Sequence, residues 1–240
     1  MVAPENPADD VIVDVPAAVV QKVPDLERLE FFNTSFVDFS FPARDIFGSL
    51  KAIRIAKSPM TEWPPNLMEL PMSTTEVSLS YLPQLEHAPP TEVRQRFPYV
   101  VRMFLDYNAL TSIPSTFRLN KLRILSMAGN QMTEFGMRSA RLNVAFLQNN
   151  RLESVPTFKR NNVQIAFCSN NLIESPPDDT FETTYVLADN PVCQSMPDAF
   201  DCNESNHACP FECRKFLNDN SHCNLECNTT SCAYDGGDCL

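Results

Sequence analysis

The sequence predicts a solenoid of α/β type, in which short parallel strands stack side by side, followed by a small disulfide-rich module. An apolar segment that ends in asparagine recurs every 19 to 22 residues, with the asparagines at Asn108, Asn130, Asn150, Asn171 and Asn190. A hydrophobic residue followed by proline or glycine closes the units, as at Trp63-Pro64, Ala88-Pro89, Ile113-Pro114, Phe135-Gly136 and Val155-Pro156. Two repeat markers in phase predict units that each pack against their neighbours. The nine cysteines are concentrated at the other end: none precedes Cys168, and seven fall between Cys202 and Cys239.

The chain begins with a segment unlike the repeats. Residues 1–25 contain four prolines and five acidic residues against a single lysine. This composition favours a flexible acidic leader, in which Val11–Val13 is a candidate edge strand. We therefore place the solenoid at residues 26–197, a cap and linker at 198–208, and the disulfide-rich module at 209–239.

The clearest copies of the repeat have the form L-x-x-L-x-L-x-x-N-x-L with conservative replacements. They are Val100–Leu110, Leu122–Met132, Leu142–Leu152 and Val163–Ile173, and a shorter copy ends with Leu187–Val192. The pattern resembles the leucine-rich repeat family over residues 26–197, in about eight units. The resemblance implies that each x-L-x-L-x stretch is a short parallel strand with its apolar side chains inside the solenoid. The return path is too short for a full helix, so we expect a convex side that is irregular or only briefly helical.

The first three units are degenerate. Thr34 and Ser58 occupy the asparagine position in two of them. In the unit around Val77–Leu79, that position holds either Leu82 or Pro83, depending on a shift of one residue. The pattern leaves this choice open and predicts less regular turns in these units.

The last repeat leads into a candidate C-terminal cap. Asn190-Pro-Val-Cys193 is followed by Cys202, and a solenoid end needs a cover for its apolar core. We predict a disulfide between Cys193 and Cys202. Cys168 occupies a position of the repeat that normally holds a core leucine, so we expect a buried free thiol there.

The tail has the cysteine spacing C-x3-C-x9-C-x3-C-x4-C-x6-C and ends in Asp-Gly-Gly-Asp-Cys. Six cysteines alone allow about 15 pairings. The spacing, the Cys227-Asn228 step and the last five residues resemble a Lin-12/Notch repeat over residues 209–239. The resemblance implies the disulfides Cys209–Cys232, Cys213–Cys227 and Cys223–Cys239. A module this small cannot fold on its apolar core alone, so disulfides and a metal must supply much of its stability.

The metal that the resemblance implies is calcium, a hard cation that prefers oxygen ligands. Asp235 and Asp238 flank two glycines, and the family also uses an oxygen three residues before its third cysteine, which is Asn220 here. The alternative is that Asp-Gly-Gly-Asp is only a turn. Zinc fits less well, because the sulfur atoms are needed for disulfides and only His207 and His222 lie nearby.

Charge and motifs exclude several classes of function. The net charge is −11 without any basic run, which excludes a nucleic-acid partner. With five glycines and no GxxxxGK[ST] or GxGxxG motif, nucleotide chemistry has no support. The three histidines, His87, His207 and His222, lie in no recognisable catalytic motif, so we expect no enzyme.

Cysteine usage points to an extracellular or cell-surface location. The N-terminus lacks the features of a signal peptide, and no apolar run is long enough to span a membrane. We therefore expect an export leader, and a possible membrane anchor, outside this sequence. Three glycosylation sequons, at Asn33, Asn203 and Asn228, agree modestly with secretion.

The repeat also predicts a binding surface on the concave strand face. The central outward position holds Glu30, Arg54, Ser78, Phe104, Ser126, Phe146, Phe167 and Val186 in successive units. One strand position earlier stand Arg102, Ile124, Val144 and Ile165. Apolar surface of this size is typical of an interface, although another part of the chain or a neighbouring molecule covering it is a strong alternative. We predict partner binding by Phe104, Phe146, Phe167, Arg102, Ile124, Val144 and Ile165.

The sequence therefore favours a non-catalytic extracellular recognition protein that binds a protein or peptide on its concave face. A structural adhesion protein, in which the solenoid is a spacer, is the alternative from another class. A secreted hydrolase is a third and weaker hypothesis. Saturable binding of a partner separates the first hypothesis from the second.

Overall fold

The structure is a computed structural model. It describes residues 25–32, 48–63, 70–88, 99–114, 117, 119–137, 141–158, 163–176, 183–196 and 202. All structural statements below concern these residues.

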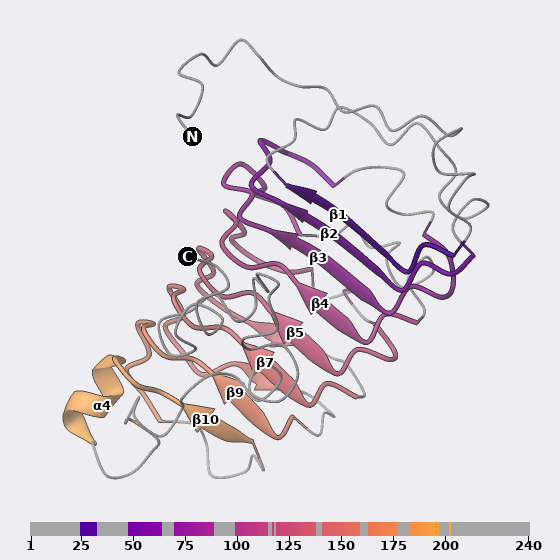
Figure 1. Ribbon diagram of the computed structural model, residues 1–240. Helices are drawn as coiled ribbons and strands as arrows, with labels where there is room; N and C mark the ends of the chain where they lie inside the picture. The colour runs from indigo at the N-terminus through magenta and orange to yellow at the C-terminus, as the bar shows by residue number, and fades with distance from the viewer. Residues whose placement is uncertain are drawn as a thin grey trace, which may run out of the picture.

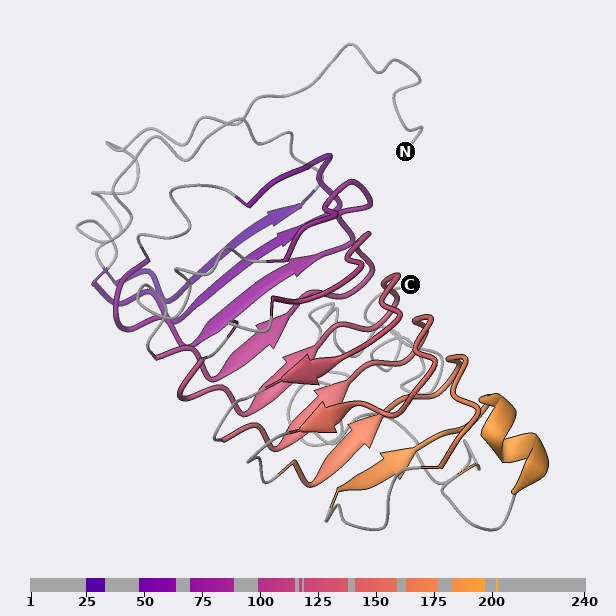
Figure 2. The ribbon, with the colours of Figure 1, turned by 180° about the vertical axis from the view of Figure 1, so that it is seen from behind.

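One parallel sheet of eight strands runs through the described part of the chain, in the order β1-β2-β3-β4-β5-β7-β9-β10. The strands lie side by side from β1 to β10 in both ribbon views (Figures 1 and 2). Their bounds are β1 Arg28–Phe32, β2 Ala52–Ala56, β3 Glu76–Ser80, β4 Arg102–Phe104, β5 Ile124–Ser126, β7 Val144–Phe146, β9 Ile165–Phe167 and β10 Thr184–Val186. Each repeat unit contributes one strand, so the predicted parallel-strand solenoid is confirmed.

The return side of the solenoid is largely irregular in the described residues. It contains one short parallel pair, β6 Gly136–Met137 and β8 Thr157–Phe158. The single helix in the described ranges is α4 Pro191–Ser195, which follows the last strand. Over the described residues the return side is thus irregular or only briefly helical, as the sequence predicted.

The core lies on one side of the large sheet, because successive side chains of a strand point to opposite faces. Ile53, Val77, Met103, Leu125 and Ala145 are all at most 1% exposed and belong to one hydrophobic cluster. The residues that flank them in each strand lie on the other side of the sheet, which is the predicted concave face. Pairing of the strands places Glu30, Arg54, Ser78, Phe104, Ser126, Phe146, Phe167 and Val186 in one row across that face. This row is the one that the sequence predicted.

Five buried asparagines, which we call the asparagine ladder, join each unit to the one before it. They are Asn108, Asn130, Asn150, Asn171 and Asn190. Asn150 shows the pattern: its Nδ2 donates to the carbonyl oxygens of Leu147, at 3.0 Å, and Met127, at 2.9 Å. Its Oδ1 accepts the backbone N–H of Met132 at 3.1 Å. One side chain thus forms hydrogen bonds with backbone groups of two units, at positions where the strands have ended.

The residue before each ladder position has a left-handed backbone. In the ladder units these residues are Tyr107, Gly129, Asn149, Asn170 and Asp189. Lys57 and Tyr81 have the same conformation in two degenerate units, with φ values of 56° and 58°. Ser58 and Leu82 therefore occupy the asparagine position, which settles the choice between Leu82 and Pro83. Thr34 lies outside the described residues.

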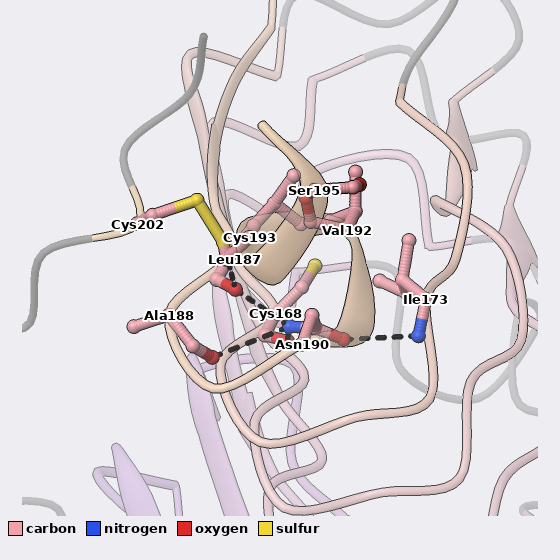
Figure 3. The surroundings of a disulfide bond; sticks show 9 residues. All are labelled: Cys168, Ile173, Leu187, Ala188, Asn190, Val192, Cys193, Ser195 and Cys202. Carbon is pink, nitrogen blue, oxygen red and sulfur yellow. Dashed lines mark hydrogen bonds between the residues drawn. A yellow bond between two sulfur atoms is a disulfide. The ribbon is translucent and has the colours of Figure 1, made fainter. Parts of the chain in front are cut away.

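The C-terminal end of the solenoid is closed by α4 and a disulfide (Figure 3). Cys193, in α4, is bonded to Cys202 with a Cα–Cα distance of 5.6 Å, so the predicted pairing is confirmed. The last ladder residue, Asn190, immediately precedes the helix and accepts the backbone N–H of Ile173 at 3.0 Å. The cap is thus fixed both to its own unit and to the unit before it.

Candidate functional site

The concave face has two halves of different chemistry. Charged side chains from β1 to β4 occupy its N-terminal half, and apolar side chains from β4 to β9 occupy the next part. Both halves come from the same rows of the sheet, so their proximity follows from strand register alone. β4 is the boundary, since it presents Arg102 and Phe104 on the same face.

The charged half is centred on Glu76, which is only 3% exposed. Its Oε1 accepts hydrogen bonds from Arg54, with Nη2 at 2.9 Å and Nε at 3.2 Å. Its Oε2 accepts one from Nε of Arg102 at 2.8 Å. Glu30 lies 3.8 Å from Nε of Arg54 and extends the network to β1. Side chains from four neighbouring strands are thereby fixed relative to one another.

Burial and charge act in opposite directions on Glu76. Burial alone would raise the pKa of its carboxyl group, but the guanidinium groups of Arg54 and Arg102 and the hydrogen bond from Arg54 lower it more strongly. The net pKa lies below the ordinary value of 4.5. Glu76 is therefore ionised at neutral pH and holds both arginines in place.

The apolar half forms a hydrophobic cluster of its own, separate from the core. Phe104, Ile124 and Phe146 are its buried members, and Val144 and Phe167 pack against them. The rings of Phe146 and Phe167 are stacked, with centroids 4.9 Å apart and an angle of 7° between their planes. The structure thus brings together five of the six apolar residues of the predicted binding set, and Ile165 is the one outside this cluster.

Exposure divides the proposed binding residues into two groups. Phe104, Ile124 and Phe146 are 5%, 7% and 6% exposed, so they support the surface rather than form it. Val144, Ile165 and Phe167 are partly exposed, and we call these three residues the apolar rim. Arg102 is also partly exposed, with 42% of its side-chain surface accessible. Arg102 and the apolar rim are therefore the most exposed members of the predicted set.

Two polar residues of this face were not among the predicted site residues. Gln148 follows Phe146 by two residues on the same side of the chain, and its Oε1 is buried without a hydrogen-bond partner. Asp106 follows Phe104 in the same way and accepts hydrogen bonds from Ser126 and from the backbone N–H of Ala128. Extending the outward row by two residues past each strand would have found both.

An aromatic pair lies at the strand ends, beside this face. The rings of Tyr81 and Tyr107 are stacked, with centroids 4.6 Å apart. Burial, with smaller effects of Tyr107 and Asp106, raises the pKa of Tyr81. The Tyr107 ring covers Gly129, where a Cβ atom would overlap it. A side chain at Gly129 is thus disfavoured by this contact, whereas the left-handed backbone alone is adopted by asparagine, aspartate and tyrosine in the other ladder units.

The remaining predicted sites divide between the core and the tail. Cys168 is free and buried, as expected, and burial raises the pKa of its thiol, which makes it a poor nucleophile. The calcium ligands Asn220, Asp235 and Asp238, the three tail disulfides and the sequon residues Asn33, Asn203 and Asn228 lie outside the described residues. Within the described ranges, no group of three or more histidine, cysteine or acidic residues is placed to hold a metal ion.

Comparison with known proteins found similarities for both parts of the chain. The family model of the Notch LNR domain matches residues 206–240. Among solved structures, a leucine-rich repeat protein from Bacteroides eggerthii has 15% identity and a TM-score of 0.40, over 75% of this chain and 45% of that one. A leucine-rich repeat protein from Leptospira interrogans has 17% identity and a TM-score of 0.45, over 75% of this chain and 58% of that one. No curated protein sequence matches the chain.

The fold is a leucine-rich repeat solenoid, as the repeat and the asparagine ladder define it. The chain spans about half the length of the two solved proteins, at 45% and 58%. None of the helices in the described residues is long and apolar enough to cross a membrane.

Proposed function

We propose that this chain is a non-catalytic extracellular recognition protein that binds a protein or peptide on the concave face of its solenoid. The observation that carries the proposal is the second hydrophobic cluster, which lies on the side of the sheet opposite to the core. A repeat unit needs apolar residues on its core side to fold, but solvated polar residues suffice on the other side. Phenylalanines at three positions of this face are therefore better explained by recognition than by folding.

The arrangement also provides what a protein interface requires. Interfaces combine buried aromatic anchors with a polar or charged border. Val144 and Phe167 of the apolar rim pack against Phe104, Ile124 and Phe146, and the Glu76 network fixes Arg102. A surface whose side chains are already held in place loses less conformational entropy when a partner binds.

The test substitutes the residues a partner contacts, rather than those that support the face. Val144, Ile165 and Phe167 are changed together to serine in the full chain. Partners are captured from extracellular proteins, purified, and their affinity is measured by calorimetry. We expect binding to weaken by at least about 100-fold, because three apolar contacts are lost.

A matched control removes exposed apolar side chains elsewhere. Met72 and Leu172 are 60% and 50% exposed, and their change to serine should leave partner affinity unchanged. Equal affinities of the native chain and the triple variant would contradict the proposal. Failure of any protein to bind saturably would favour a structural spacer instead.

The LNR domain is proposed to bind calcium through Asn220, Asp235 and Asp238. The donor set supports this, since two carboxylates and an amide oxygen suit a hard cation better than a soft one. The ion would add stability to a module that has little apolar core, together with the proposed disulfides Cys209–Cys232, Cys213–Cys227 and Cys223–Cys239. The proposed extracellular location fits such disulfides and glycosylation at Asn33, Asn203 and Asn228.

Calcium binding is tested with the metal alone. Calcium titrated into the chelated chain should bind in a calorimeter and raise the unfolding temperature. Asp235→Asn together with Asp238→Asn should abolish both effects, while Glu226→Gln, a nearby acid outside the proposed set, should preserve them. An unfolding temperature that ignores both calcium and chelator would refute the calcium site.

A further inference from the structure

Arg102 is prepared to receive an anion. Its Nε is engaged by Glu76 at 2.8 Å, and among the described residues Glu76 is its only ion-pair partner. The terminal nitrogens Nη1 and Nη2 remain for a ligand, on a side chain that is 42% exposed. Because Glu76 is itself held by Arg54, the Arg102 guanidinium is fixed in position before any ligand arrives. A fixed guanidinium binds a carboxylate through two hydrogen bonds.

The negative charge of the whole chain directs an acidic ligand to Arg102. The net charge is −11, so an acidic ligand is repelled by most of the surface. Around Glu76 the balance is reversed locally, since the connected ion pairs join three arginines, Arg28, Arg54 and Arg102, to only two carboxylates. An acidic group gains most by binding where Arg102 is exposed.

The apolar rim begins two strands away from Arg102. Arg102 is in register with Ile124, which is in register with Val144 and then Ile165. Two strand spacings separate β4 from β7, which is about 10 Å. An extended peptide covers this distance in about three residues. One segment can therefore place an acid at Arg102 and a large apolar side chain on the rim.

Gln148 adds a requirement for a hydrogen-bond donor. Its Oε1 is buried and without a hydrogen-bond partner, and the residue follows Phe146 of the apolar cluster by two positions. Leaving a buried acceptor unpaired is unfavourable. Gln148 as a whole is only half-buried, so a rotation of its amide group would bring Oε1 to a backbone N–H of a ligand. A peptide supplies such donors at every residue, whereas a small carboxylic acid does not.

We infer that the concave face binds an extended peptide segment in which a carboxylate side chain and a large apolar side chain are about three residues apart. The carboxylate pairs with Arg102, the apolar side chain packs on the apolar rim, and a backbone N–H donates to Gln148. This inference rests on the proposed function and names the class of partner that the face selects.

The probe is a library of random twelve-residue peptides displayed on phage and selected on the full chain. Enriched sequences are then synthesised as C-terminal amides, so that any carboxylate comes from aspartate or glutamate. We expect an acid about three residues from a leucine or aromatic residue. Arg102→Gln should weaken these peptides about tenfold or more, because a charged hydrogen-bonded pair is lost. Replacing the acid in the peptide should cause a similar loss, and the two changes combined should add little.

Two controls separate binding from folding. Arg151→Gln removes an exposed arginine outside the site and should leave peptide affinity unchanged. Arg102→Lys retains the charge beside Glu76 and should retain part of the affinity. Thermal unfolding of each variant shows whether a loss of affinity reflects a loss of structure.

Other outcomes would overturn the inference in distinguishable ways. Enriched peptides without acids, unaffected by Arg102→Gln but lost with the triple rim variant, would leave the proposed function intact and reject the acidic anchor. Peptides that need only a free C-terminal carboxylate would reject the internal segment. If no peptide is enriched, the inference that the face binds a peptide is rejected. If sedimentation shows a dimer that Arg102→Gln dissociates, the occupant of the face is a second copy of the chain and not a peptide.

Discussion

At the residue scale, the asparagine ladder concentrates many hydrogen bonds in a few side chains. Asn150 alone engages Met127, Leu147 and Met132, and it is only 8% exposed. Hydrophobic side chains of similar volume could fill the same space. They could not form hydrogen bonds with the backbone N–H and C=O groups that are unpaired where the strands end, and buried unpaired groups are strongly unfavourable.

Changing Asn150 to alanine should therefore lower the free energy of unfolding by about 2–4 kcal/mol, since several buried groups lose their partner. Urea unfolding followed by circular dichroism measures this. The control is Asn149→Gly, next to it in the chain and exposed, where glycine suits the left-handed backbone and should cost under about 1 kcal/mol. Similar effects of the two changes would contradict the role given to the ladder.

Glu76 makes the free energy of unfolding depend on pH. Because the pKa of its folded form lies below 4.5, its contribution is fully present above that pH. The contribution is lost as the pH falls from about 4.5 through the lowered folded-state pKa, where protonation breaks its ion pairs. Glu76→Gln should cost about 3 kcal/mol at pH 7 and should flatten the decline in acid.

Chemical unfolding of both proteins from pH 7 to pH 2 measures this difference. Glu134→Gln, which alters an exposed carboxylate, should change the free energy of unfolding at pH 7 by less than about 0.5 kcal/mol. Parallel curves for the native chain and Glu76→Gln would show that the network does not couple stability to protonation.

At the element scale, the end of the solenoid depends on a very short helix. α4 has five residues, and a helix of that length is unstable without tertiary contacts. Val192 of α4 is buried against the last unit, and Cys193 carries the disulfide to Cys202. The disulfide reduces the number of unfolded conformations of the segment that follows the helix. This stabilises the folded state by about 2–3 kcal/mol for a loop of this length.

Replacing Cys193 and Cys202 together by serine should loosen this end first. Hydrogen exchange followed by mass spectrometry should show faster exchange in residues 183–196 and little change in β2 and β3. Ser195→Ala, a change in the same helix, should leave the exchange pattern close to native. A uniform increase along the solenoid would indicate that the cap stabilises the whole array equally.

At the scale of the whole molecule, the repeat allowed strand register to be predicted from sequence. Phe104, Phe146 and Phe167 were assigned to one row because each precedes its asparagine by four residues, and the strand pairs place them there. Ser58 was assigned to its position for the same reason. The Tyr81–Leu82 turn was ambiguous, since no amide side chain marks it and only its left-handed backbone reveals it.

The exposure of each side chain and the pairing between side chains could not be predicted from the sequence. Phe104 and Phe167 occupy the same position of the repeat, yet Phe104 is buried and Phe167 is partly exposed. Likewise, Arg54 and Glu76 lie 22 residues apart, and no local pattern links them. Such properties depend on what surrounds each side chain in three dimensions, whereas the period reports only the face to which it belongs.

The asparagine ladder also separates what must stay constant in this chain from what is free to vary. Neighbouring ladder residues are 19 to 22 positions apart, yet every strand pairs with its neighbour in the same register. Differences in length are absorbed between one ladder residue and the next strand. Residues can therefore be inserted or removed on the outer side of the solenoid, and reshape it, without shifting the rows of the concave face.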